Sequence, residues 1–288
     1  MSQTEARQPV PSDVELGRRA FRRVQTVKSV LIAAASSLVL GTALIAFLVL
    51  SPGWARIQAQ FLSWDAAMAA LPKVWEGFLL NLQVLGISAI LILVVALLVA
   101  AARTLPGPIF FPVRVLAAAY TDLFRGIPLI ILLMLLGFGI PGLGLYEDYI
   151  PIWYFGILAL TLTYSAYVAE VFRSGIEAVH PSQRYAARSL GLSHGKTMRL
   201  IVIPQAVRKV TPALMNDFVA LQKDVGLISV LGAVDAVRAA QISTAANFNY
   251  TPYVVAAVLF ILLAIPTIRL TDWYAAKLRA REQTGAIV

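Results

Sequence analysis

Long apolar runs constrain the fold of this chain more than any other feature of its sequence. Residues 29–50, 79–102 and 251–270 each supply the roughly 20 residues of helix that cross a bilayer. A helix of a soluble domain would carry a polar face, but residues 87–102 hold Ser88 as their one polar side chain. With 59% hydrophobic and 14% charged residues over 288 positions, the chain is predicted to be an integral membrane protein.

The apolar pattern as a whole predicts an all-α, polytopic transmembrane protein with about six spans. The predicted spans are 29–50, 79–102, 114–141, 152–172, 205–228 and 251–270. The third and the fifth of these are the least cleanly apolar, because they contain several charged and polar residues.

These spans divide the chain into parts with different expected surroundings. We expect a cytoplasmic N-terminal tail (1–27), an extra N-terminal transmembrane helix (28–50), an outer interfacial segment (51–78), a core transmembrane domain (79–280) with a cytoplasmic loop (173–208), and a cytoplasmic C-terminal tail (281–288). The interfacial segment contains Trp54, Trp64 and Trp75. Tryptophan is enriched at headgroup depth, so this segment is expected to lie along the membrane surface.

The lysines and arginines predict the orientation. If the N-terminus is cytoplasmic, all but four of the 24 basic residues lie at the inner face, the four being Arg56, Lys73, Lys223 and Arg238. Cytoplasmic loops of membrane proteins carry an excess of Lys and Arg, so both termini are predicted to be inside. The net charge of +9 is therefore explained by topology, and no nucleic-acid partner is expected.

The loop at 173–208 carries the most specific motif. Ala186, Ala187, Gly191, Ile201 and Pro204 fit the spacing A-A-x3-G-x9-I-x-x-P. This spacing resembles the cytoplasmic EAA loop of permease subunits of ABC importers, although the acidic residue before the alanines is replaced here. The resemblance implies the type I ABC importer permease fold, with a short coupling helix seated in a cleft of an ATPase subunit.

The coupling residues that this resemblance implies are Tyr185, Ala186, Ala187, Arg188, Ser189, Leu190, Gly191 and Leu192. Two alanines followed by a glycine allow a tight helix–turn–helix that exposes a small knob. The alternative is that Ala-Ala-x3-Gly marks an ordinary helix end with a glycine cap.

Other segments resemble the polar amino-acid permeases of that family, the histidine, glutamine and arginine type. They read YTDLFRGIP (120–128), YVAEVFRSGIEAV (167–179), PQA (204–206) and NDFVALQKDVGL (216–227). The similarity covers roughly residues 70–280 and leaves the first 50 residues as an addition.

Ionisable residues within the predicted spans are candidates for the solute path, because a charge inside a bilayer is costly unless it is paired or lines a wet cavity. A zwitterionic amino acid needs a cation for its carboxylate and an anion for its ammonium. The candidate substrate-binding residues are Arg125, Gly126, Pro128, Asp217, Lys223 and Asp224.

Geometry supports several of these candidates. Asp217 and Asp224 are seven residues apart, so they share one helix face about 10 Å apart along the axis. Gly126 and Pro128 are expected to break the third span beside Arg125 and expose backbone groups to a cavity. The alternative for Arg125 is that it extends to the inner interface. Glu170 and Arg173 are expected to form a structural pair.

The sequence therefore predicts the permease subunit of an ATP-driven importer of amino acids or related small polar solutes in the bacterial inner membrane. Expected partners are a second permease subunit (identical or homologous), an ABC ATPase dimer, an extracytoplasmic solute-binding protein and membrane lipid. No cofactor or metal is expected on this chain, and ATP–Mg is expected on the partner ATPase.

Two alternatives remain open at this level. The first is a secondary transporter driven by an ion gradient, which would need broken helices in two symmetry-related halves. The second is an intramembrane enzyme, which would need a nucleophile or metal constellation. Whether the solute is basic, acidic or neutral is undecided.

Overall fold

The computed structural model describes residues 12–144 and 150–285, and over these residues every regular element is helical. The chain divides into two compact units, Met1–Ala59 and Gln60–Val288. Four helices of the described residues are long and apolar enough to cross a membrane, and the number rises to six if each of two bent pairs is one span. The predicted all-α fold with about six spans is confirmed.

The first unit is built around a single long helix, α1 (Asp13–Val49). Its N-terminus is capped by Ser12, whose Oγ accepts a hydrogen bond from the backbone N–H of Glu15 at 3.4 Å. The predicted span at 29–50 forms the C-terminal part of α1. The helix begins 15 residues before the predicted extra helix at 28–50, inside the part expected to be a tail. A short helix, α2 (Trp54–Phe61), follows it.

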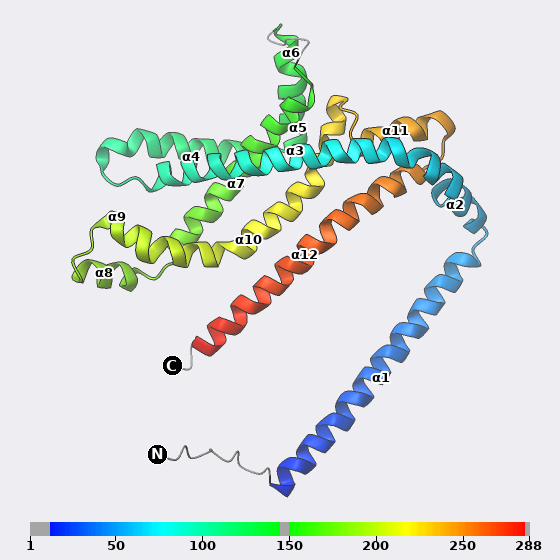
Figure 1. Ribbon diagram of the computed structural model, residues 1–288, viewed down its shortest axis with the longest axis horizontal. Coiled ribbons are helices and arrows are strands. Elements are labelled where there is room, and N and C mark those ends of the chain that lie inside the picture. The colour runs from blue at the N-terminus through cyan, green and yellow to red at the C-terminus, as the bar shows by residue number, and fades with distance from the viewer. Residues whose placement is uncertain (1–11, 145–149, 286–288) are drawn as a thin grey trace, which may run out of the picture. The chain divides into compact units, whose positions relative to one another are not determined.

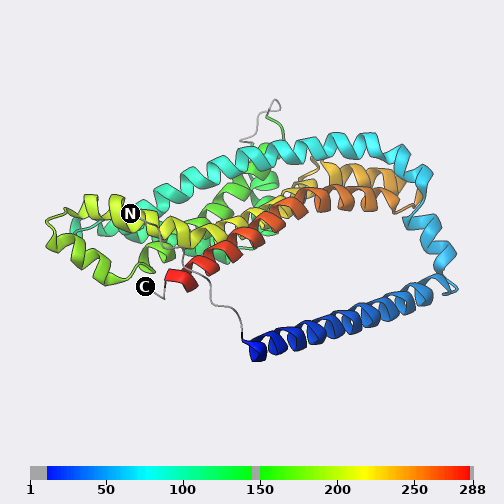
Figure 2. The ribbon, with the colours of Figure 1, turned by 60° about the horizontal axis from the view of Figure 1, so that its bottom comes forward.

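The second unit is organised around two helices, α3 (Trp64–Thr104) and α7 (Trp153–Glu177), which pack along each other. Small side chains, among them Ala96 of α3 and Ala169 of α7, are fully buried in the core cluster that the two helices share and let the two backbones approach closely. The last helix, α12 (Thr251–Gly285), lies alongside α3 and α10 (Ile203–Asp224) (Figure 1; Figure 2).

Helix α3 starts further upstream than the predicted span at 79–102. Residues 64–78, expected in the outer interfacial segment, belong to the same continuous helix. Val74 and Phe78 are buried against residues of α11 (Ala236–Asn247) and α12, so this part of α3 is packed as well as helical. Its depth relative to the membrane surface stays a prediction.

The predicted third span is two arms that meet at a bend. A short turn, η1 (Pro108–Phe110), leads into α4 (Phe111–Gly126), and α5 (Leu129–Met134) continues through η2 (Leu135–Gly139) and α6 (Ile140–Gly142). The two arms are bent by 101° at Ile127 and Pro128. The break expected from Gly126 and Pro128 is therefore present, and its sharpness makes 114–141 unlike a straight span.

The predicted fifth span, 205–228, is also longer and more broken than expected. It comprises η3 (Met198–Val202), α10 (Ile203–Asp224) and η4 (Val225–Leu231), and it is followed by α11 (Ala236–Asn247). The helical stretch that ends at Leu231 and α11 are bent by 52° relative to each other. The sequence did not predict α11, whose residues fall between the fifth and sixth predicted spans.

A buried polar network holds α11 in place. Asn81 Nδ2 donates to Asp235 Oδ2 at 2.9 Å and to the Val225 carbonyl at 3.2 Å, and Asn81 Oδ1 accepts from the Ala236 N–H at 3.0 Å. Asp235 Oδ1 caps α11 by accepting from the Arg238 N–H at 2.8 Å. Gly77 makes room for this contact, because a Cβ there would lie 2.3 Å from the Asp235 carbonyl carbon.

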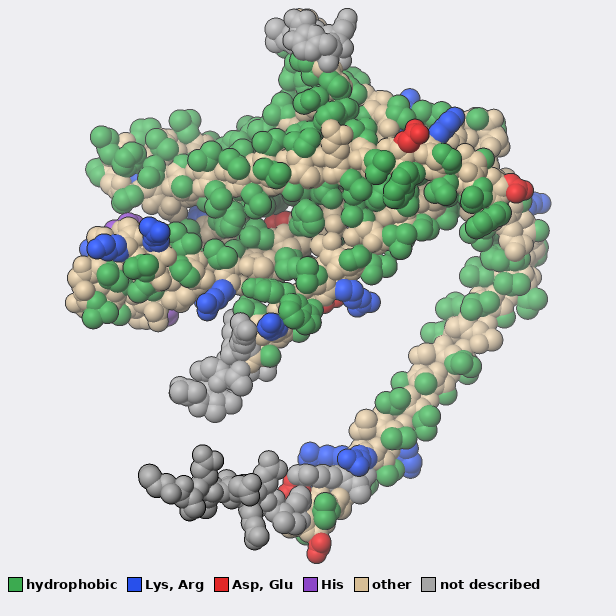
Figure 3. All heavy atoms as spheres, in the orientation of Figure 1, with side chains coloured by type: hydrophobic (Ala, Val, Ile, Leu, Met, Phe, Trp, Pro, Cys, Tyr) green, Lys and Arg blue, Asp and Glu red, His purple; other side chains and the backbone are tan. Residues whose placement is uncertain are grey.

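The surface separates apolar flanks from basic ends. In Figure 3 hydrophobic side chains cover much of α3, α4 and α12, as expected for helices that face lipid tails. Lysine and arginine side chains gather over α8 (Pro181–Ser189) and α9 (His194–Thr197). Both helices lie in the loop that the charge pattern predicts to be cytoplasmic.

Candidate functional site

A cavity of about 490 Å³ lies beside the bend between α4 and α5. Five of the six predicted substrate-binding residues line it: Arg125, Gly126, Pro128, Asp217 and Asp224. The sixth, Lys223, is exposed and outside the lining. Tyr164, Tyr167 and Thr163 of α7 complete its polar wall. The structure thus gathers residues that are up to 99 positions apart in the sequence.

The bend itself supplies part of the cavity wall. Proline lacks an N–H and disfavours helical geometry in the residue before it, and Ile127 is accordingly extended with φ −90° and ψ 125°. The Arg125 carbonyl, in the last turn of α4, accepts a hydrogen bond from the Tyr167 hydroxyl at 3.2 Å. The Arg125 guanidinium lies over the same ring, 5.7 Å from its centroid.

The two carboxylates of the cavity are held differently. Asp224 Oδ2 accepts a hydrogen bond from the Tyr164 hydroxyl at 2.7 Å. Asp217 Oδ2 is buried and has no hydrogen-bond partner among the described residues. A buried carboxylate oxygen without a donor is costly, so Asp217 is the group of this cavity most in need of a cationic or hydrogen-bonding partner.

The predicted coupling segment forms helix α8 and the turn after it. His180 caps its N-terminus and Pro181 occupies the first turn. At its C-terminus the Gly191 N–H donates to the Arg188 carbonyl at 2.9 Å and the Leu192 N–H to the Ala187 carbonyl at 3.1 Å. This pair of bonds is a Schellman motif, with Gly191 in the left-handed conformation at φ +77°.

The eight predicted coupling residues therefore lie together on one short helix end. Ala187 is buried against the rest of the loop, whereas Tyr185, Ala186, Arg188, Ser189, Leu190 and Gly191 are exposed and Leu192 is half-buried. The glycine-capped helix end and the exposed knob, treated above as alternatives, are one structure. What the knob contacts stays a prediction.

Two basic side chains bond to the end of α7, Arg184 from α8 and Lys209 from α10. Arg184 Nη2 donates to the Ile176 carbonyl at 2.6 Å, and Lys209 Nζ donates to the Ala178 carbonyl at 2.7 Å. Both bonds satisfy carbonyls at the C-terminus of α7, where cations are favoured. A displacement of α8 would therefore be transmitted to α7, which lines the cavity.

Comparison with known proteins identifies the family. The model of the family described as "Binding-protein-dependent transport system inner membrane component" matches residues 108–280. The chain belongs to this family. The match includes the bend, the coupling segment and most of α12, whereas α1 and all of α3 lie outside it.

Individual relatives of the permease agree with this assignment. The arginine transport system permease protein ArtQ of Bacillus subtilis (strain 168) is 32% identical over 205 residues, covering 71% of this chain and 91% of that protein. The nopaline transport system permease protein NocQ of Agrobacterium fabrum (strain C58 / ATCC 33970) is 36% identical over 166 residues, covering 54% and 70%. A solved structure described as "Crystal structure of an amino acid ABC transporter with histidines" is 30% identical with a TM-score of 0.68, covering 75% and 98%.

The permease is thus the multi-pass, transmembrane component of a bacterial ABC importer in the inner membrane, and ATP is hydrolysed by a separate ATPase. Its relatives are amino-acid permeases. This replaces the secondary transporter and the intramembrane enzyme as interpretations.

The permease also contains a charged cluster that the sequence predicted only in part. The expected ion pair of Glu170 with Arg173 is present. Glu170 Oε2 also accepts from Arg103 Nη1 at 2.6 Å and lies 3.9 Å from Arg125 Nη1. Arg173 pairs in turn with Glu177. We call Arg103, Arg125, Glu170, Arg173 and Glu177 the Glu170 cluster.

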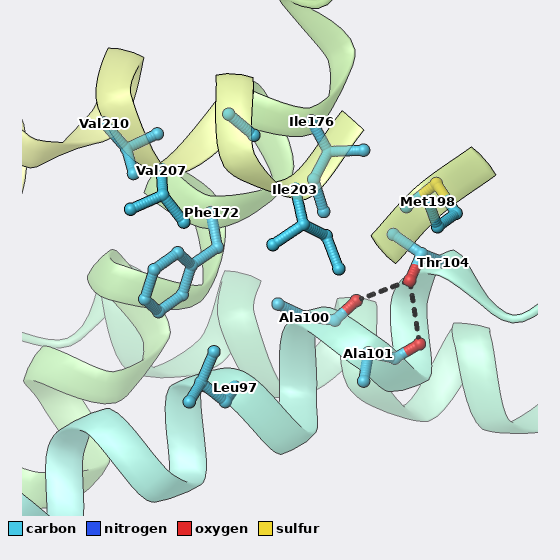
Figure 4. A pocket seen from close by; sticks show the side chains of 11 residues that line it. Leu97, Ala100, Ala101, Thr104, Phe172, Ile176, Met198, Ile203, Val207 and Val210 are labelled. Carbon is cyan, nitrogen blue, oxygen red and sulfur yellow. Dashed lines mark hydrogen bonds between the residues drawn. The ribbon is translucent and has the colours of Figure 1, made fainter. Parts of the chain in front are cut away.

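A second hollow in the permease has different chemistry. It measures about 200 Å³ and is lined by apolar residues of α3, α7 and α10, including Leu97, Phe172 and Val210 (Figure 4). Thr104 brings its one polar side-chain group, and its Oγ already donates to the Ala100 and Ala101 carbonyls at 3.1 and 3.0 Å. The hollow offers no charge to a zwitterion, so the cavity beside Arg125 is the better candidate for a polar solute.

Proposed function

We propose that the cavity at the α4–α5 bend binds an amino acid on its way through the membrane. The solute carboxylate pairs with Arg125, and its ammonium pairs with Asp217. The observation that carries this proposal is that positively and negatively charged side chains line the same cavity of about 490 Å³. Pockets of this size suit small ligands whose orientation is set by a few polar groups.

Charge balance favours a cationic amino acid. The lining of the cavity holds one arginine, Arg125, and two carboxylates, Asp217 and Asp224. One negative charge is in excess, and a solute with one net positive charge neutralises it. A relative that is 32% identical is named for arginine transport, which supports the same solute.

The proposed machine needs further subunits. A second permease copy or homologue lies beside this chain in the membrane, a dimeric ABC ATPase that binds ATP–Mg contacts residues 185–192, and a solute-binding protein delivers the amino acid from outside. The exposed end of α8 and the bond of its Arg184 to the end of α7 support the ATPase contact. No cofactor is assigned to the permease itself.

The test is binding of L-arginine to the purified permease–ATPase complex, measured with the wild type, Arg125→Gln and Asp217→Asn. Each substitution removes a charge-assisted contact, so each is expected to weaken binding by roughly tenfold or more. Lys223→Gln is the matched control, because Lys223 is exposed and outside the cavity lining. Equal binding by all four proteins would reject this cavity as the solute site.

A further inference from the structure

The Arg125 guanidinium lies between the solute cavity and the Glu170 carboxylate. Its side chain is 39% exposed and lines the cavity, and its Nη1 lies 3.9 Å from Glu170 Oε2. That distance is too long for a hydrogen bond but short enough for electrostatic attraction. Arg125 is therefore held loosely on the side facing away from the solute.

Glu170 does not depend on Arg125 for its own stability. Its Oε2 accepts a 2.6 Å hydrogen bond from Arg103 Nη1, and Arg173 donates to both carboxylate oxygens. Arg103 is held in turn by Thr121, whose Oγ1 accepts from Arg103 Nη1 at 3.1 Å. The carboxylate would remain paired if the Arg125 guanidinium moved away.

The Glu170 cluster carries one more positive than negative charge. Its three arginines face two glutamates, and both glutamates are in closer contact with Arg173 or Arg103 than with Arg125. The guanidinium left without a close anion is the one that lines the cavity. The carboxylate of an incoming solute would meet a guanidinium that already faces the cavity and is only weakly paired with Glu170.

We propose that Glu170 is a positioning residue. It holds the Arg125 guanidinium beside the cavity by electrostatic attraction and releases it when the carboxylate of the solute binds. The proposal rests on the proposed function of Arg125 as the carboxylate ligand. Glu170 touches no solute, because it is not part of the cavity lining. It acts by competing for Arg125, so that binding and release of the solute carboxylate exchange one anion for another.

Competition makes a quantitative prediction. When part of the protein has its binding group engaged elsewhere, the apparent dissociation constant rises by the inverse of the free fraction. A partly exposed ion pair supplies a factor of up to about five. Removing the Glu170 charge should therefore tighten solute binding by up to about fivefold. A stronger attraction between Glu170 and Arg125 should weaken solute binding.

The experiment measures binding of L-arginine to the purified permease–ATPase complex for two variants with opposite expected effects. Glu170→Gln frees Arg125 and is expected to bind L-arginine about threefold to fivefold more tightly, with slower uptake because release is no longer assisted. Arg103→Gln removes one of the two arginines that compete with Arg125 for Glu170, so Glu170 attracts Arg125 more strongly and L-arginine binding weakens by a similar factor. General damage to the fold would weaken binding in both.

Glu76→Gln is the matched control, because it is the same substitution at an exposed residue outside both the Glu170 cluster and the cavity lining. Its L-arginine binding should match the wild type. Unchanged or weaker binding by Glu170→Gln would overturn the proposal, as would tighter binding by Arg103→Gln. If Arg125→Gln also binds normally, the fault lies with the proposed solute site; if Arg125→Gln loses binding, only the role of Glu170 fails. Should Glu170→Gln not assemble with the ATPase, tighter L-arginine binding by Arg103→Gln would still overturn the proposal.

Discussion

Gly191 provides the sharpest test of the coupling segment, because its backbone conformation suits few other residues. At φ +77° an L-residue pays about 1–2 kcal/mol, and a β-branched residue pays at the upper end. No atom outside the neighbouring residues lies within 4 Å of a Cβ at this position, so the cost of Gly191→Val comes from the backbone and not from a clash.

The strain in Gly191→Val can be relieved only by opening the turn. That would break the bonds from the Gly191 and Leu192 N–H groups, at 2.9 and 3.1 Å, to the carbonyls of α8. Each such bond contributes about 1 kcal/mol, so either outcome costs about 2 kcal/mol locally. The free-energy cost falls on the end of α8 and leaves the spans unchanged.

We expect Gly191→Val to lower ATP-driven uptake of L-arginine by roughly tenfold or more, since each 1.4 kcal/mol is a factor of ten. The assay is uptake into proteoliposomes that contain the complete transporter, with the amount of inserted permease measured in parallel. Gly195→Val is the control, because Gly195 lies inside α9 with open space around it. Wild-type uptake by a fully inserted Gly191→Val protein would refute the reasoning.

Two further predictions concern the buried network around Asp235. Asn81→Leu removes the hydrogen-bond partner of Asp235 Oδ2 and of the Ala236 N–H, which should lower the free energy of unfolding by about 2–4 kcal/mol. Gln83→Leu, at an exposed neighbouring position, should not lower it. Thermal unfolding in detergent measures both variants, and equal melting temperatures would contradict the account. Gly77→Ala places a Cβ 2.3 Å from the Asp235 backbone and should destabilise the protein. The control Gly86→Ala places its Cβ where no atom lies within 4 Å and should leave the stability unchanged. A Gly77→Ala protein as stable as wild type would show that α11 can shift at little cost.

The sequence predicts best those features that depend on local physics. Long apolar runs specify membrane helices because a bilayer requires every backbone group to be paired within the helix, and this holds for α1, α3, α7 and α12. The bend after Gly126 follows from proline geometry alone. The glycine end of α8 follows from the need for a left-handed residue at a helix cap.

Features that depend on distant partners could not be predicted. Helix α11 is short and mixed in character, and the bond that fixes its N-terminus joins Asp235 to a residue 154 positions away. The charge pattern places Arg103 at the inner face with most other basic residues but does not predict its ion pair, because its partner Glu170 is 67 positions further along. Lys223 was predicted in the site from its neighbours in sequence, but its place on α10 puts it outside the cavity lining.

The central claim is that the end of α8 contacts the ATPase, and site-directed cross-linking tests it most directly. The chain contains no cysteine, so a single one can be introduced without background. Leu190→Cys lies at the exposed end of α8 (81% exposed), and Leu143→Cys lies at a comparably exposed position (74%) on the predicted opposite side of the membrane. With a short bifunctional reagent on the assembled transporter, the account predicts a permease–ATPase product from Leu190→Cys and none from Leu143→Cys. Labelling of Leu190→Cys from the external side, or the absence of any ATPase product from it, would contradict the account.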